Sequence, residues 1–102
     1  MVELALDPTA SGPALIAAAI EGHTATVAAL LAAEGVDPNA AGAYGGTALI
    51  RAAGEGHTAT VAALLAAEGV DPNAATANGD TALCLAAALG HTEIAEMLRL
   101  AT

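Results

Sequence analysis

Residues 21–41 read EGHTATVAALLAAEGVDPNAA, and residues 55–75 repeat this run letter for letter. The two runs begin 34 residues apart, and a degraded third copy, GHTEIAEML at residues 90–98, keeps the same spacing. A fixed period of this size is typical of repeat proteins, in which each unit packs on its neighbours and about three units are needed for stability. The sequence therefore predicts a stack of three structural units.

The residues upstream of each copy also align. They read GPALIAAA at residues 12–19, GTALIRAA at residues 46–53 and DTALCLAA at residues 80–87. Thr47 and Thr81 are predicted helix N-caps, because a hydroxyl can accept a hydrogen bond from the free N–H groups of the first turn. Pro13 replaces threonine in the first copy and is predicted at the first helical position, where its missing N–H costs nothing.

Each unit is predicted to contain two helices joined by a tight turn. The first helix ends at a glycine that can adopt the left-handed conformation, as the C′ position often requires; these glycines are Gly22, Gly56 and Gly90. The second helix carries one apolar stripe, Val27, Leu30 and Leu31, and is predicted to stop at Gly35. A hairpin-like loop follows, and Asn78-Gly79 favours a two-residue hairpin turn there.

These anchors at fixed spacing resemble the ankyrin repeat family over roughly residues 9–102. The motifs that carry the resemblance are Gly46-Thr47-Ala48-Leu49, Ala52-Ala53, Gly56-His57, Val61, Leu64-Leu65 and Gly69-Val70-Asp71-Pro72-Asn73. The resemblance implies an all-α solenoid of stacked helix-turn-helix units with short hairpin-like loops. It implies one domain, residues 1–102, with an N-terminal segment at 1–11 and repeats at about 12–45, 46–79 and 80–102.

The chain departs from the family pattern in three respects. The Thr-Pro-Leu-His run of the family appears as Thr-Ala-Leu-Ile at residues 47–50 and Thr-Ala-Leu-Cys at residues 81–84, so the helix starts are expected to be less firmly held. Glu34 and Glu68 resemble one-residue insertions that lengthen the usual period of the family by one. Gly42 and Thr76 replace the aspartate that often opens the hairpin in the family.

The resemblance also implies where a partner would bind. In ankyrin repeats the hairpin tips and the exposed face of the first helix form a concave surface. The corresponding positions are Ala43, Tyr44, Gly46, Arg51, Gly54, Glu55, Ala77, Asn78, Asp80, Leu85, Ala88 and Leu89. Tyr44 and Arg51 are the expected anchors, because tyrosine and arginine are enriched among the residues that dominate binding energy. The predicted function is therefore a non-enzymatic protein-interaction module.

Charge argues against two other classes of partner. The net charge is −9, with Arg51 and Arg99 as the only basic residues besides three histidines. Nucleic-acid binding draws its affinity from lysine and arginine on phosphates, and anionic membranes attract basic segments. Neither class is expected as a partner. No secretory signal is visible at the start of the chain, so a cytoplasmic protein is expected.

The residues do not favour catalysis, a metal site or a cofactor. His23, His57 and His91 lie one repeat apart, about 8–10 Å between packed helices, whereas zinc ligands must all reach within about 2.1 Å of one ion. The histidines are instead expected to bridge loop and helix by hydrogen bonds. Cys84 is expected as a small buried or half-buried apolar side chain. The recurring glutamates are expected to form a solvated acidic face.

The two ends of the stack differ in composition. Glu93, Glu96 and Arg99 give the last helix a partly polar outer face, whereas residues 14–20 of the first helix are apolar all round. Either Val2, Leu4 and Leu6 fold over that helix or another molecule does, so a homo-oligomer formed through the N-terminal repeat is a further prediction. An alternative function also stays open. The unbroken identity of residues 21–41 and 55–75 suits a designed or recently duplicated structural scaffold without an evolved partner.

Overall fold

The computed structural model describes residues 8–33 and 35–101. Within these ranges the elements are α1 (Pro8–Ile20), α2 (Thr24–Ala32), the 3₁₀ turn η1 (Ala43–Gly45), α3 (Ala48–Glu55), α4 (Thr58–Ala66), α5 (Ala82–Ala88) and α6 (Thr92–Ala101). Isolated β-bridges join Ala41 to Thr47 and Ala75 to Thr81, and each closes a hairpin-like loop. The predicted all-α architecture is confirmed. No helix of the described ranges is both long and apolar enough to cross a membrane.

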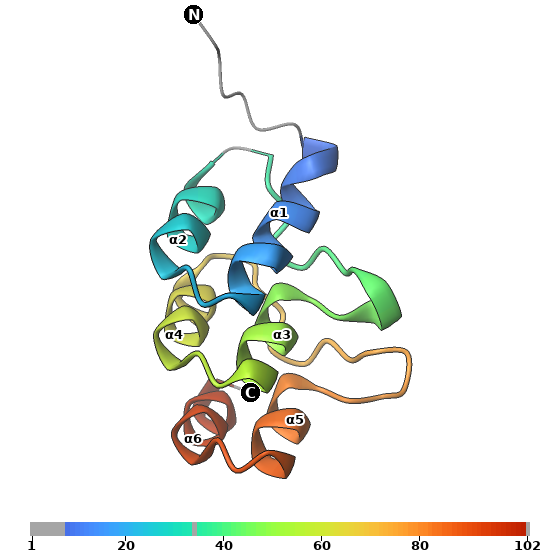
Figure 1. The fold of residues 1–102 in the computed structure, drawn as a ribbon, viewed down its shortest axis with the longest axis vertical. Coiled ribbons are helices and arrows are strands. Elements are labelled where there is room, and N and C mark those ends of the chain that lie inside the picture. The colour runs from blue at the N-terminus through green and yellow to red at the C-terminus, as the bar shows by residue number, and fades with distance from the viewer. Residues whose placement is uncertain (1–7, 34, 102) are drawn as a thin grey trace, which may run out of the picture.

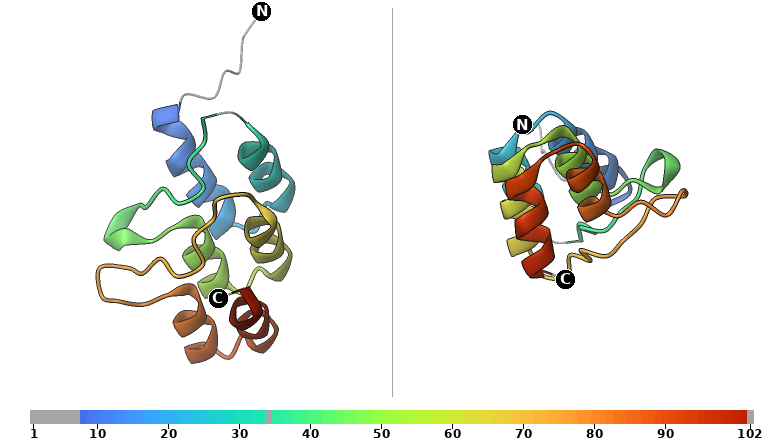
Figure 2. Two further views of the ribbon diagram at one scale, coloured as in Figure 1. Left: turned by 180° about the vertical axis from the view of Figure 1, so that it is seen from behind. Right: turned by 90° about the horizontal axis from the view of Figure 1, so that it is seen from below.

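The helices form two parallel rows (Figure 1). The inner row consists of α1, α3 and α5, and the outer row consists of α2, α4 and α6. Each helix packs on the helix of the same row in the next repeat, and each repeat packs its inner helix on its outer helix. The two hairpin-like loops project away from the rows on the side of the inner helices, as both views in Figure 2 show. The stack measures 46 × 25 × 22 Å.

The ends of the inner helices are fixed as the sequence predicts. The Thr47 hydroxyl accepts a hydrogen bond from the Ile50 N–H at 3.2 Å, and Thr81 makes the equivalent bond with the Cys84 N–H at 3.2 Å. The absence of the family's histidine therefore does not leave these helix starts uncapped. The three glycines after the inner helices, Gly22, Gly56 and Gly90, have φ values of 72°, 81° and 80°. Their left-handed conformation turns the chain into the outer helix.

The core runs without interruption between the two rows. Aliphatic side chains of the outer row meet small and aliphatic side chains of the inner row, and all belong to one buried cluster. Val27 and Leu30 are buried and Leu31 is half-buried against this cluster, as the predicted stripe requires. Alanine dominates the inner row, so its helices approach closely and the core needs no aromatic side chain.

Two predicted details of the loops are wrong. The outer helices end at Ala32 and Ala66, three residues before the glycines that were expected to stop them. Asn78-Gly79 does not form a two-residue hairpin turn with both residues at positive φ, since only Gly79 has a positive φ. The Thr76 hydroxyl accepts from the N–H groups of Asn78 and Asp80 at 3.3 and 3.2 Å, and these bonds hold a wider loop.

The prediction that Pro13 opens the first helix is also wrong. Helix α1 begins at Pro8, so Pro13 lies inside it. A proline at this position removes the N–H that would donate to the carbonyl four residues earlier, and its ring crowds that carbonyl. Two other expectations lie outside the described residues: the folding of Val2, Leu4 and Leu6 over the first helix, and the insertion at Glu34.

The position of Pro13 leads to a stability prediction. Pro13→Ala is expected to raise the free energy of unfolding by about 1–3 kcal/mol, because it restores a helical hydrogen bond and removes a steric conflict. Pro72→Ala is the control, because Pro72 lies in a loop, where losing proline makes the unfolded chain more flexible and costs about 0.4–1 kcal/mol. Urea unfolding of both variants measures the effects. A loss of stability in Pro13→Ala would mean that α1 starts at Pro13 after all.

Candidate functional site

Histidines join successive repeats. The Nε2 atom of His57 donates to the Ile20 carbonyl at 2.9 Å, and that of His91 donates to the Gly54 carbonyl at 3.3 Å. The His57 ring lies directly over Gly22, where a Cβ atom would come within 2.7 Å of its Nδ1 atom. The expected bridging role of these two histidines is confirmed. It makes them parts of the stack rather than of a reactive site.

His23 belongs to the first repeat and has a different neighbour. Its Nε2 atom lies 3.6 Å from a carboxylate oxygen of Glu21, and both side chains are largely exposed. In the part of the chain that the structure describes, no three His, Cys, Asp or Glu side chains are grouped so that they could hold a metal ion.

Two further polar links tie the first repeat to the second. The Asn39 side chain donates to the Gly69 carbonyl at 2.7 Å and accepts from the Asp71 N–H at 2.7 Å. The hydroxyls of Thr24 and Thr60 share a hydrogen bond of 2.8 Å. These links fix the spacing of the repeats, so residues 34 positions apart occupy equivalent places along the stack.

One side of the molecule combines the inner helices with the hairpin tips, and we call it the inner face. It contains the residues at equivalent positions of α1, α3 and α5, together with the tips of both hairpins. They are Ala17, Ile20, Glu21, Ala43, Tyr44, Arg51, Gly54, Glu55, Ala77, Asn78, Leu85, Ala88 and Leu89. The sequence prediction missed the three residues from the first repeat, Ala17, Ile20 and Glu21. The 34-residue offset from Arg51, Gly54 and Glu55 could have identified them.

Arg51 braces the first hairpin. Its Nη2 atom donates to the Ala43 carbonyl at 2.8 Å, and its guanidinium lies against Gly46, where a Cβ atom would come within 2.5 Å of Nε. The only arginine on the inner face is therefore half-buried and already bonded within the chain. Gly46 is buried beneath it, so the prediction that Gly46 contributes to the binding surface is wrong.

Tyr44 stands at the tip of the first hairpin. Its side chain is 79% exposed, and its backbone has a φ of 59° and a ψ of 20°. Tyr44 is the only residue other than glycine with a positive φ in residues 8–33 and 35–101. Its carbonyl accepts from the Ala77 N–H at 2.8 Å, so the second hairpin holds the first in place. The tip therefore presents an aromatic ring on a strained backbone.

Because of this strain, tyrosine is expected to be less stabilising than glycine at the hairpin tip. Tyr44→Gly is expected to raise the free energy of unfolding by about 1 kcal/mol, because glycine adopts positive φ without steric cost. Asn78→Gly is the matched control, since it occupies the equivalent position with an ordinary φ, and there glycine adds only flexibility to the unfolded chain. Urea unfolding distinguishes the two. Equal destabilisation by both substitutions would contradict the strain at Tyr44.

The predicted residues of the second hairpin differ in exposure. Asn78 is exposed at the tip, whereas Asp80 is half-buried at the base. The Asp80 carbonyl accepts from the Thr76 N–H at 2.9 Å, which closes the loop. The structure therefore brings Asn78 close to the tip of the first hairpin and places Asp80 beside the start of α5.

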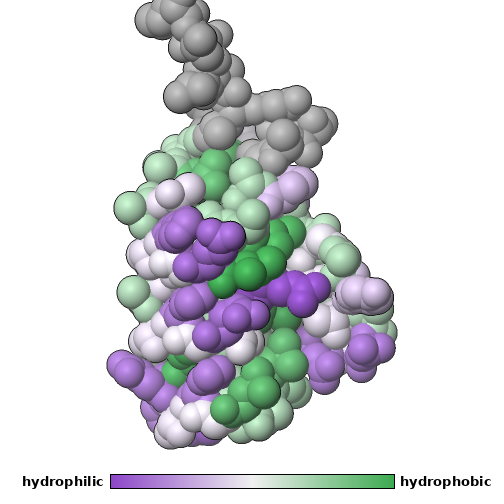
Figure 3. Space-filling model, in the orientation of Figure 1, coloured by the Kyte–Doolittle hydropathy of each residue, from purple (hydrophilic) through white to green (hydrophobic). Residues whose placement is uncertain are grey.

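The helical part of the inner face changes character along the stack. Glu55 on α3 is exposed, and Leu89, its counterpart 34 residues later, is 57% exposed at the end of α5. Leu85 is half-buried one turn earlier, beside Gly54, where a Cβ atom would lie 3.9 Å from its Cδ1 atom. The face is thus acidic at α3 and apolar at α5. Figure 3 shows polar and hydrophobic patches side by side on this side of the molecule, with a hydrophobic one at the lower end.

Cys84 is exposed, which contradicts the expected buried or half-buried position. Its counterpart in the second repeat, Ile50, is buried because α5 packs over it, whereas Cys84 faces the open end of the stack. The Thr81 side chain, and then the Thr81 backbone, lower the pKa of the Cys84 thiol by hydrogen bonding.

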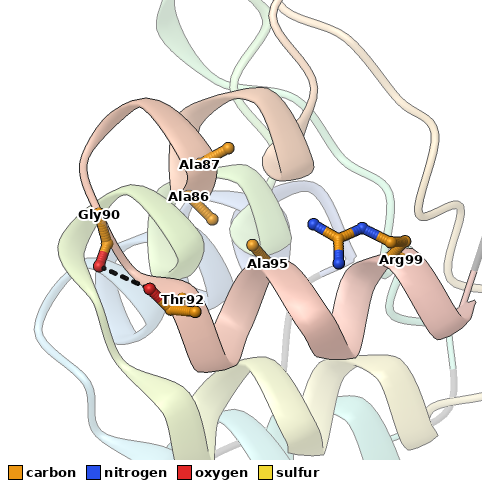
Figure 4. Close-up of a pocket in the computed structure, with 6 residues that line it drawn as sticks. All are labelled: Ala86, Ala87, Gly90, Thr92, Ala95 and Arg99. Carbon is orange, nitrogen blue, oxygen red and sulfur yellow. Dashed lines mark hydrogen bonds between the residues drawn. The ribbon is translucent and has the colours of Figure 1, made fainter.

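A pocket of about 220 Å³ lies at this same end, between α5 and α6 (Figure 4). It is lined by Ala86, Ala87, Gly90, Thr92, Ala95 and Arg99. Arg99 stands where Leu31 and Leu65 pack toward a following repeat, and it pairs with Glu96 at 3.0 Å. The pocket is therefore the stacking surface of the last repeat, and Arg99 places a charged side chain at it.

Comparison with known proteins agrees with this architecture. No curated protein matches the chain significantly. A family model described as ankyrin repeats, in three copies, matches residues 6–101. Since the match spans nearly the whole chain, and three helix pairs follow one another in the expected order with a hairpin-like loop between successive pairs, the chain belongs to the ankyrin repeat family.

Proposed function

We propose that this chain binds another protein through its inner face and catalyses no reaction. Ankyrin repeats are generally protein-interaction modules, and proteins built from them are typically non-enzymatic. The proposed contact residues are Tyr44, Arg51, Glu55, Asn78, Leu85 and Leu89 on the inner face, together with Asp80 at the base of the second hairpin. Arg51 acts in two ways, since it holds the hairpin that carries Tyr44 and also offers the remaining donors of its guanidinium.

The distribution of differences between the first two repeats carries this proposal. Residues 21–41 and 55–75 are identical, but on the inner helices Ala17 is replaced by Arg51 and Ile20 by Gly54, and at the hairpin tips Tyr44 is replaced by Asn78. In the third repeat the same two positions change again, to Leu85 and Ala88. Packing within the stack does not require exposed residues to differ between two repeats whose buried residues are the same. Between the first two repeats the exposed differences gather on the inner face and in the hairpins, which is what selective contact with a partner would produce.

The exposed aromatic ring supports the same conclusion. Tyrosine offers a large contact area with few rotatable bonds, and it recurs at the centres of interfaces. Tyr44 is the only aromatic residue of the chain. Its exposure on strained backbone is an observation that a purely structural role does not explain.

Substitution at the inner face tests the proposal. A partner is first captured with the native chain and identified, and its affinity is then measured by calorimetry. Tyr44→Ala combined with Leu89→Ser is expected to weaken binding at least about tenfold, since each removes a large exposed contact. Leu100→Ser is the matched control, because Leu100 is 83% exposed on α6, away from this face. Unchanged affinity in the double variant would reject the proposal.

A second candidate function is self-association at the N-terminal end of the stack. Thr26 and Ala14 are exposed there, whereas their counterparts in the second repeat, Thr60 and Ala48, are 1% and 0% exposed because a repeat packs on them. No charged pair like that of the last repeat occupies the outer positions of α2, which are threonine and alanine. Two copies that met through this end would cover these side chains.

Sedimentation equilibrium tests the self-association. A dimer is expected at high protein concentration, and Ala29→Glu is expected to dissociate it, because a carboxylate would be buried without a partner. Ala62→Glu on the exposed side of α4 is the control. A monomer at all concentrations would reject this candidate.

A structural scaffold without an evolved partner is the remaining alternative. Exposed outer positions such as Ala25 and Ala59 are identical in the first two repeats although packing does not dictate them. Recent duplication or design would produce such identity. If this alternative is correct, no captured protein depends on the inner face. Every protein captured with the native chain should then also bind the inner-face variants.

A further inference from the structure

The inner face carries features that select a particular chemistry of partner, and this inference rests on the proposed function. We infer that the partner segment is basic and carries an aliphatic or aromatic side chain that packs on Leu85 and Leu89. Three observations lead to this conclusion: the half-buried Leu85 and exposed Leu89 at the end of α5, the carboxylates on this side of the molecule, and the engagement of the only arginine on the inner face.

The leucines supply the apolar half of the site. Leu89 is 57% exposed and lies one helical turn, about 6 Å, beyond Leu85. Gly54 on α3 adds no side chain next to Leu85, so the surface stays open between the two helices. One aliphatic or aromatic side chain of a partner spans this distance. A partner side chain that covers Leu89 would remove its exposed apolar surface from water, which favours binding.

The carboxylates supply the charged half. Glu55 is exposed at the position equivalent to Leu89 in the adjacent repeat, and Asp80 lies at the start of α5. Glu21, directly after α1, occupies the position equivalent to Glu55 in the first repeat and lies 3.6 Å from His23. These carboxylates make this side of the molecule negative, and the chain as a whole carries a net charge of −9. A basic segment is attracted to such a surface, and an acidic one is repelled.

Arg51 offers an acidic partner only the part of its guanidinium that is not bonded within the chain. Its guanidinium donates to the Ala43 carbonyl and rests against Gly46. The other arginine of the chain, Arg99, pairs with Glu96 at the end of the stack. An acidic partner at the inner face would therefore meet one half-buried cation among several carboxylates, which is an unfavourable balance.

Selection from a random library of twelve-residue peptides tests this inference with the whole native chain as bait. Enriched peptides are expected to combine net positive charge with at least one aliphatic or aromatic residue. For individual synthetic peptides, Leu89→Ser is expected to weaken binding about tenfold and Glu55→Gln about threefold at low salt. The effect of Glu55→Gln should fade in high salt while that of Leu89→Ser persists, because salt screens exposed charges and not apolar contact.

Matched controls distinguish the inferred chemistry of the partner from the proposed function of the inner face. Leu100→Ser and Glu68→Gln make the same chemical changes at exposed positions outside the inner face and are expected to leave binding unchanged. Enriched peptides that depend on Leu89 but are acidic or uncharged would overturn the inferred chemistry and leave the proposed function standing. Enriched peptides that bind all inner-face variants equally, or a library that yields no binder, would overturn both.

Discussion

Leu64→Ala is expected to lower the free energy of unfolding by about 2–5 kcal/mol, because a fully buried leucine would leave a cavity in a closely packed core. Leu64 has no exposed surface and lies on α4, the outer helix of the middle repeat. The free energy of unfolding of a small protein is only about 5–15 kcal/mol in total. In a stack of three repeats this single loss would therefore remove a large part of the stability of the whole chain.

Urea unfolding followed by circular dichroism measures this loss. Leu100→Ala is the control, since Leu100 is 83% exposed and its truncation is expected to change stability by less than about 0.5 kcal/mol. A loss below about 1 kcal/mol in Leu64→Ala would contradict a core that runs through the middle repeat. Since α4 packs on the outer helices before and after it, one unfolding transition is expected rather than separate transitions for each repeat.

The second large effect concerns the turn between α3 and α4. Gly56→Ala is expected to destabilise the chain for two reasons. At a φ of 81°, alanine costs about 1–2 kcal/mol. Its Cβ atom would also lie 2.8 Å from Cε1 of His91, so the ring must move away from the Gly54 carbonyl that it bonds. A lost hydrogen bond adds about 0.5–1.5 kcal/mol.

Gly90→Ala separates these two costs. Gly90 has nearly the same φ, 80°, but a Cβ atom there would meet nothing within 4 Å. It is therefore expected to show the conformational cost alone and to be about 0.5–1.5 kcal/mol less harmful than Gly56→Ala. In a His91→Ala background the difference should vanish. Equal effects of Gly56→Ala and Gly90→Ala in the native background would show that His91 does not pack on Gly56.

Local signals in the sequence were sufficient for most of the fold. The capping threonines, the glycines after the inner helices and the apolar stripe of the outer helix each act over a few residues, and each took its predicted place. The bridging role of His57 and His91 could be predicted as well. Their spacing of one repeat rules out a shared site and leaves a repeated structural contact.

Two of the errors, those at Cys84 and Pro13, share a physical cause, which is that the environment of a residue depends on its neighbouring repeat. Cys84 was expected to be covered and is exposed, because its counterpart Ile50 owes its burial to α5 and no described helix follows α6. Pro13 was predicted by analogy with Thr47, but Thr47 is bridged to Ala41 at the end of a hairpin, and the described residues contain no such bridge ahead of α1. The repeat pattern predicts which helices and turns each repeat contains. It predicts which residues are buried only where another repeat packs on both sides.

The candidate binding face could be predicted in outline but not in its internal bonds. The residues of the hairpin tips and of the inner helices followed from the repeat pattern. The hydrogen bond of Arg51 to the Ala43 carbonyl did not, since it depends on the path of the hairpin. Nor could the sequence predict that Tyr44, rather than Asn78, takes the left-handed backbone, although asparagine tolerates it better.

Photo-crosslinking tests most directly whether the inner face is where a partner binds. A photoreactive phenylalanine derivative would replace Tyr44 or Leu89 on the inner face, and Ala62 on the exposed side of α4, in cells that produce the chain. After irradiation, the chains labelled at 44 and 89 are expected to form a discrete adduct with the same second protein, and the chain labelled at 62 is expected to form none. Adducts from position 62 alone would contradict the account.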